Sequence, residues 1–304
     1  MASSLDQHAT EAEVMPASNP GSNAMLHQAD NGSANMSHLP NKPPPVQGHV
    51  PPAKRNQQKK KKGQDQSQHQ NHRGTFKEIK EVRPYAVPSK ASGGVPNPSA
   101  QYMAKSAVPP SHLPEPRRIL VVIDLNGTLL YRPSRKNPSR FVERPHTRAF
   151  LDYCLNTFCV AIWSSAKPDN VHKMLNQLLT PEERAKVVAI WGRDTLGLSP
   201  ADYNGRVQCY KRLTVLWADL ARRLGQRWDQ SNTVLVDDSS EKARSEPFNL
   251  IQLPEFEGDL AEQGFVLPQV HDFLNECAKQ RDISSYIRAK RFAFRPDFIL
   301  GAPA

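Results

Sequence analysis

The chain has 304 residues, of which 38% are hydrophobic and 27 are proline, and it carries a formal net charge of +10. This apolar fraction is low, so we expect one globular domain joined to a long disordered segment rather than a chain that folds throughout. No window approaches the roughly 18 consecutive apolar residues of a transmembrane helix, and the 4 cysteines show no metal-ligand spacing, which excludes a cysteine metal site.

The first 116 residues have the composition of a disordered tail. They lack tryptophan, contain Phe76, Tyr85 and Tyr102 as their only phenylalanine or tyrosine residues, and are rich in Ser, Asn, Gln, His and Pro. Such a segment cannot bury enough apolar surface to offset the entropy cost of ordering it. We therefore expect a disordered tail over residues 1–116 and a single domain over residues 117–304, a size that supports one hydrophobic core.

The tail contains a basic run, Lys54–Lys62, that has no acidic residue. Three interpretations remain open: a nuclear localisation signal that binds an import receptor, an arm that binds RNA loosely, and a solvated linker without a specific role. The first Lys or Arg of the chain follows Asp6, Glu11 and Glu13, a pattern that matches neither a secretory signal nor a mitochondrial presequence. We expect a protein of the nucleus or cytoplasm that does not enter a membrane.

From Arg117 onward, buried strands alternate with amphipathic helices. Each strand is a run of apolar, mainly β-branched residues, and each helix has apolar residues spaced by three and four. The expected strands span residues 119–123, 159–163, 187–191, 233–236 and 249–253, and the expected helices begin near residues 147, 168, 213, 266 and 286. Residues 192–210 contain Gly and Asp, which suggests a small β insertion. The alternation predicts a doubly wound parallel α/β sheet.

Three of the expected strands end in polar residues. Asp124 follows the first strand, Ser164 follows the second, and Asp237 and Asp238 close the fourth. Because the carboxyl ends of parallel strands share one edge of the sheet, where open α/β sheets bind ligands, we expect these side chains to meet there. Lys211 opens the helix before the fourth strand. Each residue alone has an ordinary explanation, such as a helix cap or a solvated lysine, but their order along the chain favours a site.

These motifs resemble those of the haloacid dehalogenase (HAD) superfamily, whose first motif, Asp-x-Asp-x-Thr, corresponds to Asp124-Leu-Asn126-Gly-Thr128. Within the superfamily the chain is similar to the CTD phosphatases and NLI-interacting-factor-like phosphatases. The similarity includes the segment Arg144-Pro145 before the first long helix and the closing helix around Val270–Leu274. It extends from residue 117 to about residue 294. The resemblance implies a HAD-like Rossmannoid fold, and the short segments between the motifs leave no room for a large cap domain.

The resemblance implies a catalytic site that uses Mg²⁺. Asp124 is then the phosphate-accepting nucleophile, and Lys211 neutralises it together with a phosphoryl oxygen. The implied Mg²⁺ ligands are Asp124, the backbone carbonyl of Asn126, Asp237 and Asp238. An all-oxygen set of this kind is what Mg²⁺ prefers. The implied phosphate-binding residues are Thr128, Ser164 and Lys211.

Asn126 stands at a catalytic position where the family motif has aspartate. Its backbone carbonyl can still bind Mg²⁺, but its side chain has no proton to donate near neutral pH and cannot act as a general acid or base. Loss of such a catalyst typically costs about 10²–10⁴ in rate. We therefore expect slow turnover of serine and threonine phosphates, with better leaving groups less affected.

The expected function is a Mg²⁺-dependent phosphoprotein (Ser/Thr) phosphatase that acts through an aspartyl phosphate on a phosphorylated protein segment. The alternative is a catalytically inactive pseudophosphatase or adaptor that resembles the mitochondrial presequence-translocase receptor of this family, and a mitochondrial location follows from that resemblance alone. A third interpretation makes the basic tail the working part of an RNA-associated protein. The phosphatase is favoured by the joint presence of Asp124, Lys211, Asp237 and Asp238, since a scaffold does not need a complete metal site.

Overall fold

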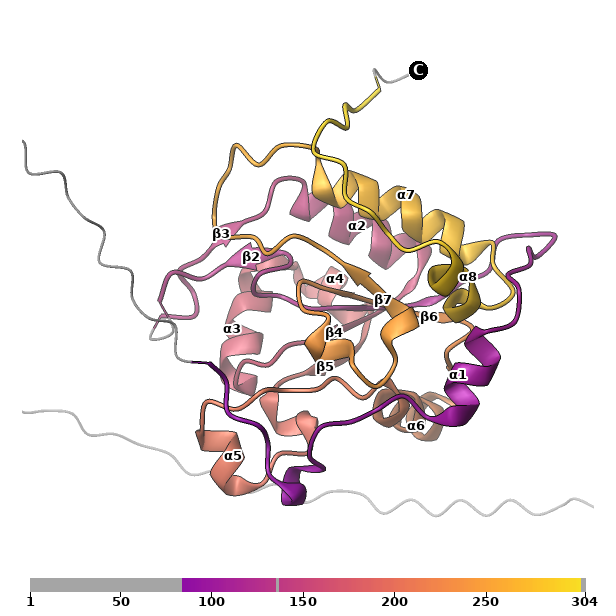
Figure 1. The fold of residues 1–304 in the computed structure, drawn as a ribbon. Coiled ribbons are helices and arrows are strands. Elements are labelled where there is room, and N and C mark those ends of the chain that lie inside the picture. The colour runs from indigo at the N-terminus through magenta and orange to yellow at the C-terminus, as the bar shows by residue number, and fades with distance from the viewer. Residues whose placement is uncertain (1–83, 135–136, 302–304) are drawn as a thin grey trace, which may run out of the picture. The chain divides into compact units, whose positions relative to one another are not determined.

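A five-stranded parallel sheet forms the centre of the domain. The structure is a computed structural model that describes residues 84–134 and 137–301 (Figure 1). The strands are β1 (Leu120–Ile123), β4 (Cys159–Trp163), β5 (Val187–Trp191), β6 (Thr233–Asp237) and β7 (Leu250–Gln252). Their order across the sheet is β5-β4-β1-β6-β7, and every neighbouring pair is parallel. The predicted fold class is therefore confirmed.

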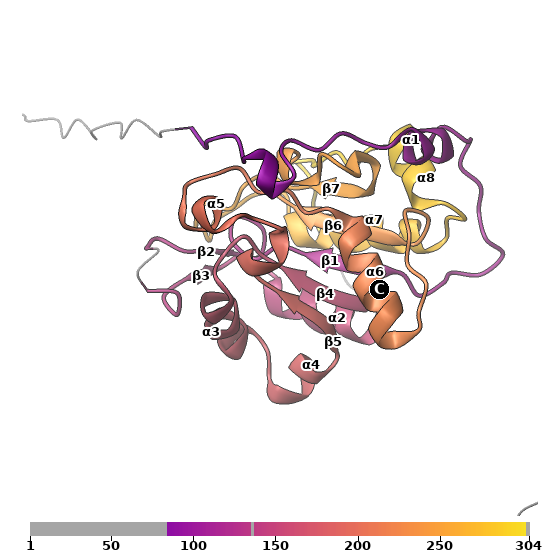
Figure 2. The same ribbon diagram turned by 90° about the horizontal axis from the view of Figure 1, so that it is seen from below.

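Helices cover both faces of this sheet (Figure 1, Figure 2). The helices are α1 (Ala100–Ser106), α2 (Thr147–Thr157), α3 (Pro168–Leu178), α4 (Pro181–Ala185), α5 (Pro200–Asn204), α6 (Leu213–Leu224), α7 (Val266–Ala278) and α8 (Ile283–Ala289). Apolar residues of α2, α3 and α7 pack with Val121 and Ile123, whereas those of α6 pack with Leu120 and Val122. A strand buried on both faces needs apolar residues at successive positions, which explains the continuous run that predicted β1.

The described segment between β5 and α6 contains two short helices and no strand, so the prediction of a small β insertion there was wrong. It contains a 3₁₀-helix, Arg193–Leu196, and α5. Gly197 and Gly205 end these two helices. A two-stranded antiparallel sheet occurs instead after the first motif, where β2 (Leu130–Tyr131) pairs with β3 (Val142–Glu143).

Residues 84–116, which we expected to belong to the disordered tail, pack against the domain. Tyr102 of α1 is 5% exposed. Its hydroxyl donates to Asn249 Oδ1 at 3.0 Å and accepts from the Phe248 N–H at 2.8 Å. Composition predicted disorder because the first 116 residues have few aromatic residues and many prolines and polar residues, whereas contacts of Tyr102 with residues far along the chain hold this segment. The folded domain thus extends back to residue 84.

The remainder of the predicted tail, residues 1–83, lies outside the described residues. This part of the chain includes the basic run Lys54–Lys62. An import receptor and RNA therefore stay predictions as partners of the basic run, and so does the nuclear location that an import signal would imply.

Replacement of Tyr102 by phenylalanine is expected to lower the free energy of unfolding by about 1–3 kcal/mol, because the fully buried Asn249 Oδ1 would lose its donor and the Phe248 N–H its acceptor. Urea unfolding of the full chain measures the change. Tyr85→Phe is the matched control, since Tyr85 is 52% exposed and loss of its hydroxyl should cost less than about 0.5 kcal/mol. Equal effects of the two substitutions would contradict the docking of α1.

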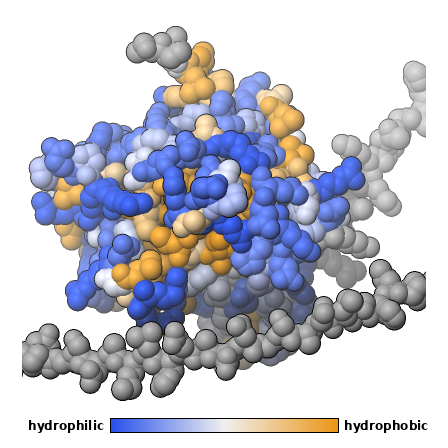
Figure 3. All heavy atoms as spheres, turned by 180° about the vertical axis from the view of Figure 1, so that it is seen from behind, coloured by the Kyte–Doolittle hydropathy of each residue, from blue (hydrophilic) through white to orange (hydrophobic). Residues whose placement is uncertain are grey.

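The surface of the domain mixes polar and apolar residues. On the side opposite to that of Figure 1, a hydrophobic area near the middle of the face is bordered by hydrophilic residues (Figure 3). Exposed apolar side chains such as Val87 and Leu260 are ordinary on a protein surface. None of the helices in residues 84–134 and 137–301 combines the length and the hydrophobicity needed to cross a membrane.

Candidate active site

The polar residues at the strand ends meet at one edge of the sheet. Asp124 follows β1, Ser164 follows β4, and Asp237 is the last residue of β6. These strands are neighbours with β1 in the centre, so parallel pairing brings their carboxyl ends together. All three residues are 2% exposed or less. The edge predicted to bind a ligand is therefore lined by buried polar groups.

Two lysines contact the acidic residues at this edge. Lys211 precedes α6 and is 1% exposed; its Nζ lies 3.0 Å from Asp124 Oδ1 and 2.5 Å from Asp237 Oδ2. Lys242 Nζ lies 2.8 Å from Asp124 Oδ2 and 2.9 Å from Asp237 Oδ1. It also lies 3.0 Å from Asp238 Oδ1. Three carboxyl groups and two ammonium groups thus form a compact cluster, which we call the acidic cluster.

The acidic cluster shifts the pKa values of two acids in opposite directions. Burial raises the pKa of Asp237, but the ammonium groups of Lys211 and Lys242 outweigh burial and lower this pKa to about 2. Burial, with repulsion from Asp124 and Asp237, raises the pKa of Asp238 to about 7, although Lys242 opposes the shift. Asp237 therefore stays ionised more readily than Asp238, and the charge of Asp238 depends on the cation beside it.

The first motif forms a tight turn after β1. Gly127 has a φ of +88°, which L side chains rarely adopt, and a Cβ there would lie 3.0 Å from Asp238 Cγ. Thr128 is fully buried, with its hydroxyl 3.5 Å from Asp238 Oδ1. Asn126 Oδ1 instead accepts a hydrogen bond from the Arg132 N–H at 3.2 Å. Thr128 therefore faces the acidic cluster, whereas the Asn126 side chain is held by the residue after β2.

The structure brings four predicted site residues together. Lys211 pairs directly with Asp124 and Asp237, and Lys242 links both of these acids to Asp238. Ser164 lies at the same edge, but among the described residues it forms no hydrogen bond with the acidic cluster, and its hydroxyl accepts from the Ala166 N–H at 3.3 Å. The catalytic and binding roles assigned to the predicted residues stay predictions.

Two residues contribute to the site that the sequence motifs did not single out as site residues. Lys242 follows Asp238 by four residues. Opposite charges at this spacing can pair along one helical turn, and this spacing is the only signal in the sequence that pointed to Lys242. Arg144 is 1% exposed, and its Nη1 donates to the Thr128 carbonyl at 2.9 Å. Arg144 Nη2 also lies 2.6 Å from Glu262 Oε1. The Arg-Pro resemblance pointed to Arg144 without indicating this role.

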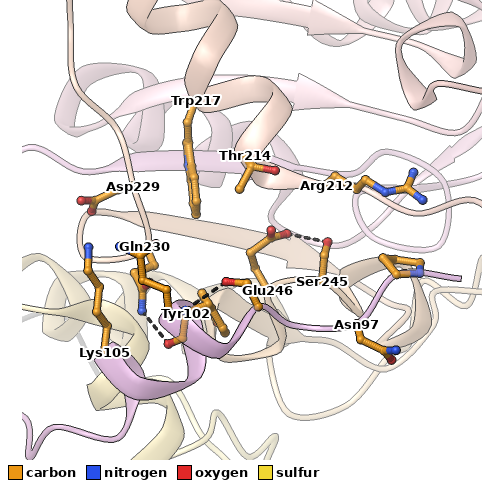
Figure 4. Close-up of a pocket in the computed structure, with 13 residues that line it drawn as sticks. Asn97, Tyr102, Lys105, Arg212, Thr214, Trp217, Asp229, Gln230, Ser245 and Glu246 are labelled. Carbon is orange, nitrogen blue, oxygen red and sulfur yellow. Dashed lines mark hydrogen bonds between the residues drawn. The ribbon is translucent and has the colours of Figure 1, made fainter. Parts of the chain in front are cut away.

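A pocket of about 420 Å³ contains none of the predicted site residues (Figure 4). Side chains of α1 and α6 line it, together with Glu246. Glu246 Oε2 accepts from the Leu213 N–H at 3.0 Å and from the Ser245 hydroxyl at 2.6 Å, while burial raises the pKa of this carboxyl group. Glu246 therefore anchors the first residue of α6, close in the chain to Lys211, and its role is structural.

The acidic cluster has the donor chemistry of a divalent-cation site. One carboxylate oxygen from each of Asp124, Asp237 and Asp238 lies within 4.8 Å of the other two. Asp124 Oδ1 is buried and accepts no well-aligned hydrogen bond within the described part of the chain, although the Lys211 ammonium is close to it. Carboxylate oxygens are the ligands that Mg²⁺ prefers, so these residues fit that ion.

Comparison with known proteins shows one family. Residues 119–284 match the family model described as NLI interacting factor-like phosphatase. An uncharacterized FCP1 homology domain-containing protein of Schizosaccharomyces pombe is 32% identical over 175 residues, which are 53% of this chain and 70% of that protein.

Two solved structures are similar to part of this chain. One is a variant of the fission yeast RNA polymerase II CTD phosphatase Fcp1 bound to beryllium fluoride, with a TM-score of 0.32 and 15% identity. That match covers 46% of this chain and 42% of the Fcp1 chain, so this chain spans less than half of the solved Fcp1 chain. The other is the L-2-haloacid dehalogenase from Xanthobacter autotrophicus, with a TM-score of 0.32 at 12% identity over 60% of this chain and 94% of that chain.

Proposed function

Because the chain belongs to the family of NLI interacting factor-like phosphatases, we propose that it removes phosphate from serine or threonine of a protein segment, through a phosphate bound covalently to Asp124. The observation that carries this proposal is the position of Asp124, a buried carboxyl group at the end of the central strand with one lysine ammonium within 3.0 Å of each oxygen. A positive charge beside each oxygen, from Lys211 at Oδ1 and from Lys242 or a bound metal ion at Oδ2, would offset the repulsion between a carboxylate and an incoming phosphate.

The proposed reaction has two steps. An Asp124 carboxylate oxygen attacks phosphorus, the bond from phosphorus to the substrate oxygen breaks, and that oxygen takes up a proton. A water oxygen then attacks the same phosphorus and gives up a proton to solvent, the bond between phosphorus and Asp124 breaks, and inorganic phosphate leaves. Because Asn126 cannot donate a proton, the leaving oxygen has to be protonated from solvent, which makes the first step slow for serine and threonine.

The proposed Mg²⁺ ligands are the carboxylates of Asp124, Asp237 and Asp238 and the backbone carbonyl of Asn126. When bound, the ion supplies further charge neutralisation between the nucleophile and the phosphate. The proposed phosphate ligands are Thr128, Ser164 and Lys211. Burial of all three supports this assignment, since polar groups out of bulk water bind an anion more strongly than exposed ones.

A phosphorylated protein segment is the proposed substrate class because of what lies between the motifs. The described residues between β1 and β4 form only β2, β3 and α2, and those between β4 and Lys211 form only α3, α4, β5, a 3₁₀-helix and α5. Neither segment holds a cap domain that could close over a small metabolite and exclude water. An uncapped site suits a substrate whose phosphate projects from a longer chain.

Replacement of Asp124 by asparagine is expected to reduce Mg²⁺-dependent hydrolysis of p-nitrophenyl phosphate by the full chain to the background rate, because an amide is a poor nucleophile at phosphorus. Chelation of the metal by EDTA should have the same effect on the wild type. Asp219→Asn is the matched control: Asp219 pairs with Arg222 and Arg223 on α6 and should leave hydrolysis unchanged.

Two results would contradict the proposal in different ways. Hydrolysis that survives Asp124→Asn would place the nucleophile elsewhere. A folded wild type without hydrolysis, together with an inactive Asn126→Asp variant, would favour a role in binding phosphorylated segments without catalysis.

A further inference from the structure

Lys242 contacts all three carboxyl groups of the proposed Mg²⁺ site. Its ammonium donates hydrogen bonds to Asp124 Oδ2 at 2.8 Å, Asp237 Oδ1 at 2.9 Å and Asp238 Oδ1 at 3.0 Å. A cation within hydrogen-bond distance of three carboxyl groups lies where their oxygens converge. This is the place that a metal ion bound by the same three residues would take.

Lys211 and Lys242 use different oxygens of the two acids that they share. Lys211 contacts Asp124 Oδ1 and Asp237 Oδ2, whereas Lys242 contacts Asp124 Oδ2 and Asp237 Oδ1. A divalent ion on the oxygens that Lys242 uses would therefore leave the contacts of Lys211 intact. The same ion and the Lys242 ammonium would repel each other at short range in a largely buried site, so the two cannot share those oxygens.

The Lys242 side chain can leave the acidic cluster without movement of the strand ends. Its backbone is held by a hydrogen bond from the Lys211 N–H to the Lys242 carbonyl at 2.8 Å. The side chain extends from the short 3₁₀-helix Glu241–Ala243 after β6 and is 15% exposed, whereas the Lys211 side chain is 1% exposed. Rotation about the bonds of its flexible four-carbon stem can carry the Lys242 ammonium to solvent.

We propose that Lys242 is a built-in competitor of the divalent cation: its ammonium lies on the three carboxyl groups in the metal-free protein and is displaced when the metal binds. This inference rests on the proposed function, because it takes these residues as the Mg²⁺ site. The protein then needs a higher metal concentration than the same site without Lys242. An ammonium in place about nine-tenths of the time raises the apparent Kd about tenfold, since only the remaining fraction is competent to bind.

The test is a calorimetric titration of the full chain with Mn²⁺ and with Mg²⁺, for the wild type and for Lys242→Met. We expect Lys242→Met to bind Mn²⁺ about tenfold more tightly or better. In EDTA this variant should unfold at a lower temperature than the wild type, and saturating Mn²⁺ should raise its unfolding temperature by more. Lys279→Met is the matched control, because Lys279 pairs with Glu276 at 44% exposure of both side chains and should leave the metal affinity unchanged.

Equal or weaker Mn²⁺ binding by Lys242→Met would overturn the inference, as would the absence of binding in both proteins. If Lys242→Met does not fold in EDTA, Lys242→Gln replaces it, because the amide keeps a hydrogen-bond donor and removes the charge. Tighter binding without phosphate hydrolysis in the metal-saturated wild type would leave the inference standing and sink the proposed function. Metal-dependent hydrolysis by the wild type, together with equal metal affinities of the wild type and Lys242→Met, would support the proposed function and overturn the inference about Lys242.

Discussion

Replacement of Asn126 by aspartate is expected to raise the turnover of a phosphoserine peptide by about 10²–10⁴, the typical contribution of one general acid–base catalyst. Aspartate has the shape of asparagine, and its oxygen can keep the hydrogen bond that Asn126 Oδ1 accepts from the Arg132 N–H at 3.2 Å. The substitution therefore adds a carboxyl group that can exchange protons while the turn keeps its geometry. Initial rates of phosphate release from the peptide at saturating Mg²⁺ measure the gain.

A comparison of two substrates distinguishes two explanations of a gain in turnover by Asn126→Asp: general acid catalysis by the new carboxyl group, and a better-folded site. p-Nitrophenolate leaves without protonation, so the same variant should gain much less on p-nitrophenyl phosphate. The double variant Asp124→Asn, Asn126→Asp is the control and should be inactive on both substrates. Equal gains on the two substrates would refute the role of position 126 as an acid, and mass spectrometry of the turn peptide verifies that Asn126 is intact in the wild type.

Replacement of Arg144 by methionine is expected to lower the free energy of unfolding by about 3–5 kcal/mol, the usual cost of removing one partner of a buried ion pair. Arg144 donates to both carboxylate oxygens of Glu262, at 2.8 and 2.6 Å. It also donates to the carbonyls of Thr128 and Pro254 at 2.9 and 2.8 Å. Methionine fills much of the same volume but leaves these acceptors without a donor, and urea unfolding measures the loss.

An exposed arginine on α6 is the matched control for Arg144. Arg222 pairs with Asp219 at 2.7 Å, but its side chain is 76% exposed. Arg222→Met should therefore change the free energy of unfolding by no more than about 0.5–1 kcal/mol. Similar losses in the two variants would show that the buried guanidinium does not hold the turn of the first motif to the chain around Pro254 and Glu262.

The local sequence pattern was sufficient to predict the parallel sheet and the edge of the sheet at which the polar site residues lie. Five successive apolar residues ending at Ile123 could only be a strand buried on both faces, and Asp124 directly after them had to lie at its carboxyl end. The same reasoning located β6 with Asp237 at its end. The segment between β5 and α6 was misassigned because glycine and aspartate serve turns and helix ends equally well.

By itself, the sequence determined the five strands of the parallel sheet, the helices with strong apolar spacing, and the strand ends at which Asp124, Ser164 and Asp237 lie, because each depends on neighbours in the chain. Only the tertiary structure decided the positions of Lys242, Arg144 and Tyr102. Lys242 lies 118 residues from Asp124 along the chain, and Tyr102 lies 147 from Asn249. A charged or polar side chain is solvated unless the fold brings a partner to it, and no local pattern records which distant residue will be that partner.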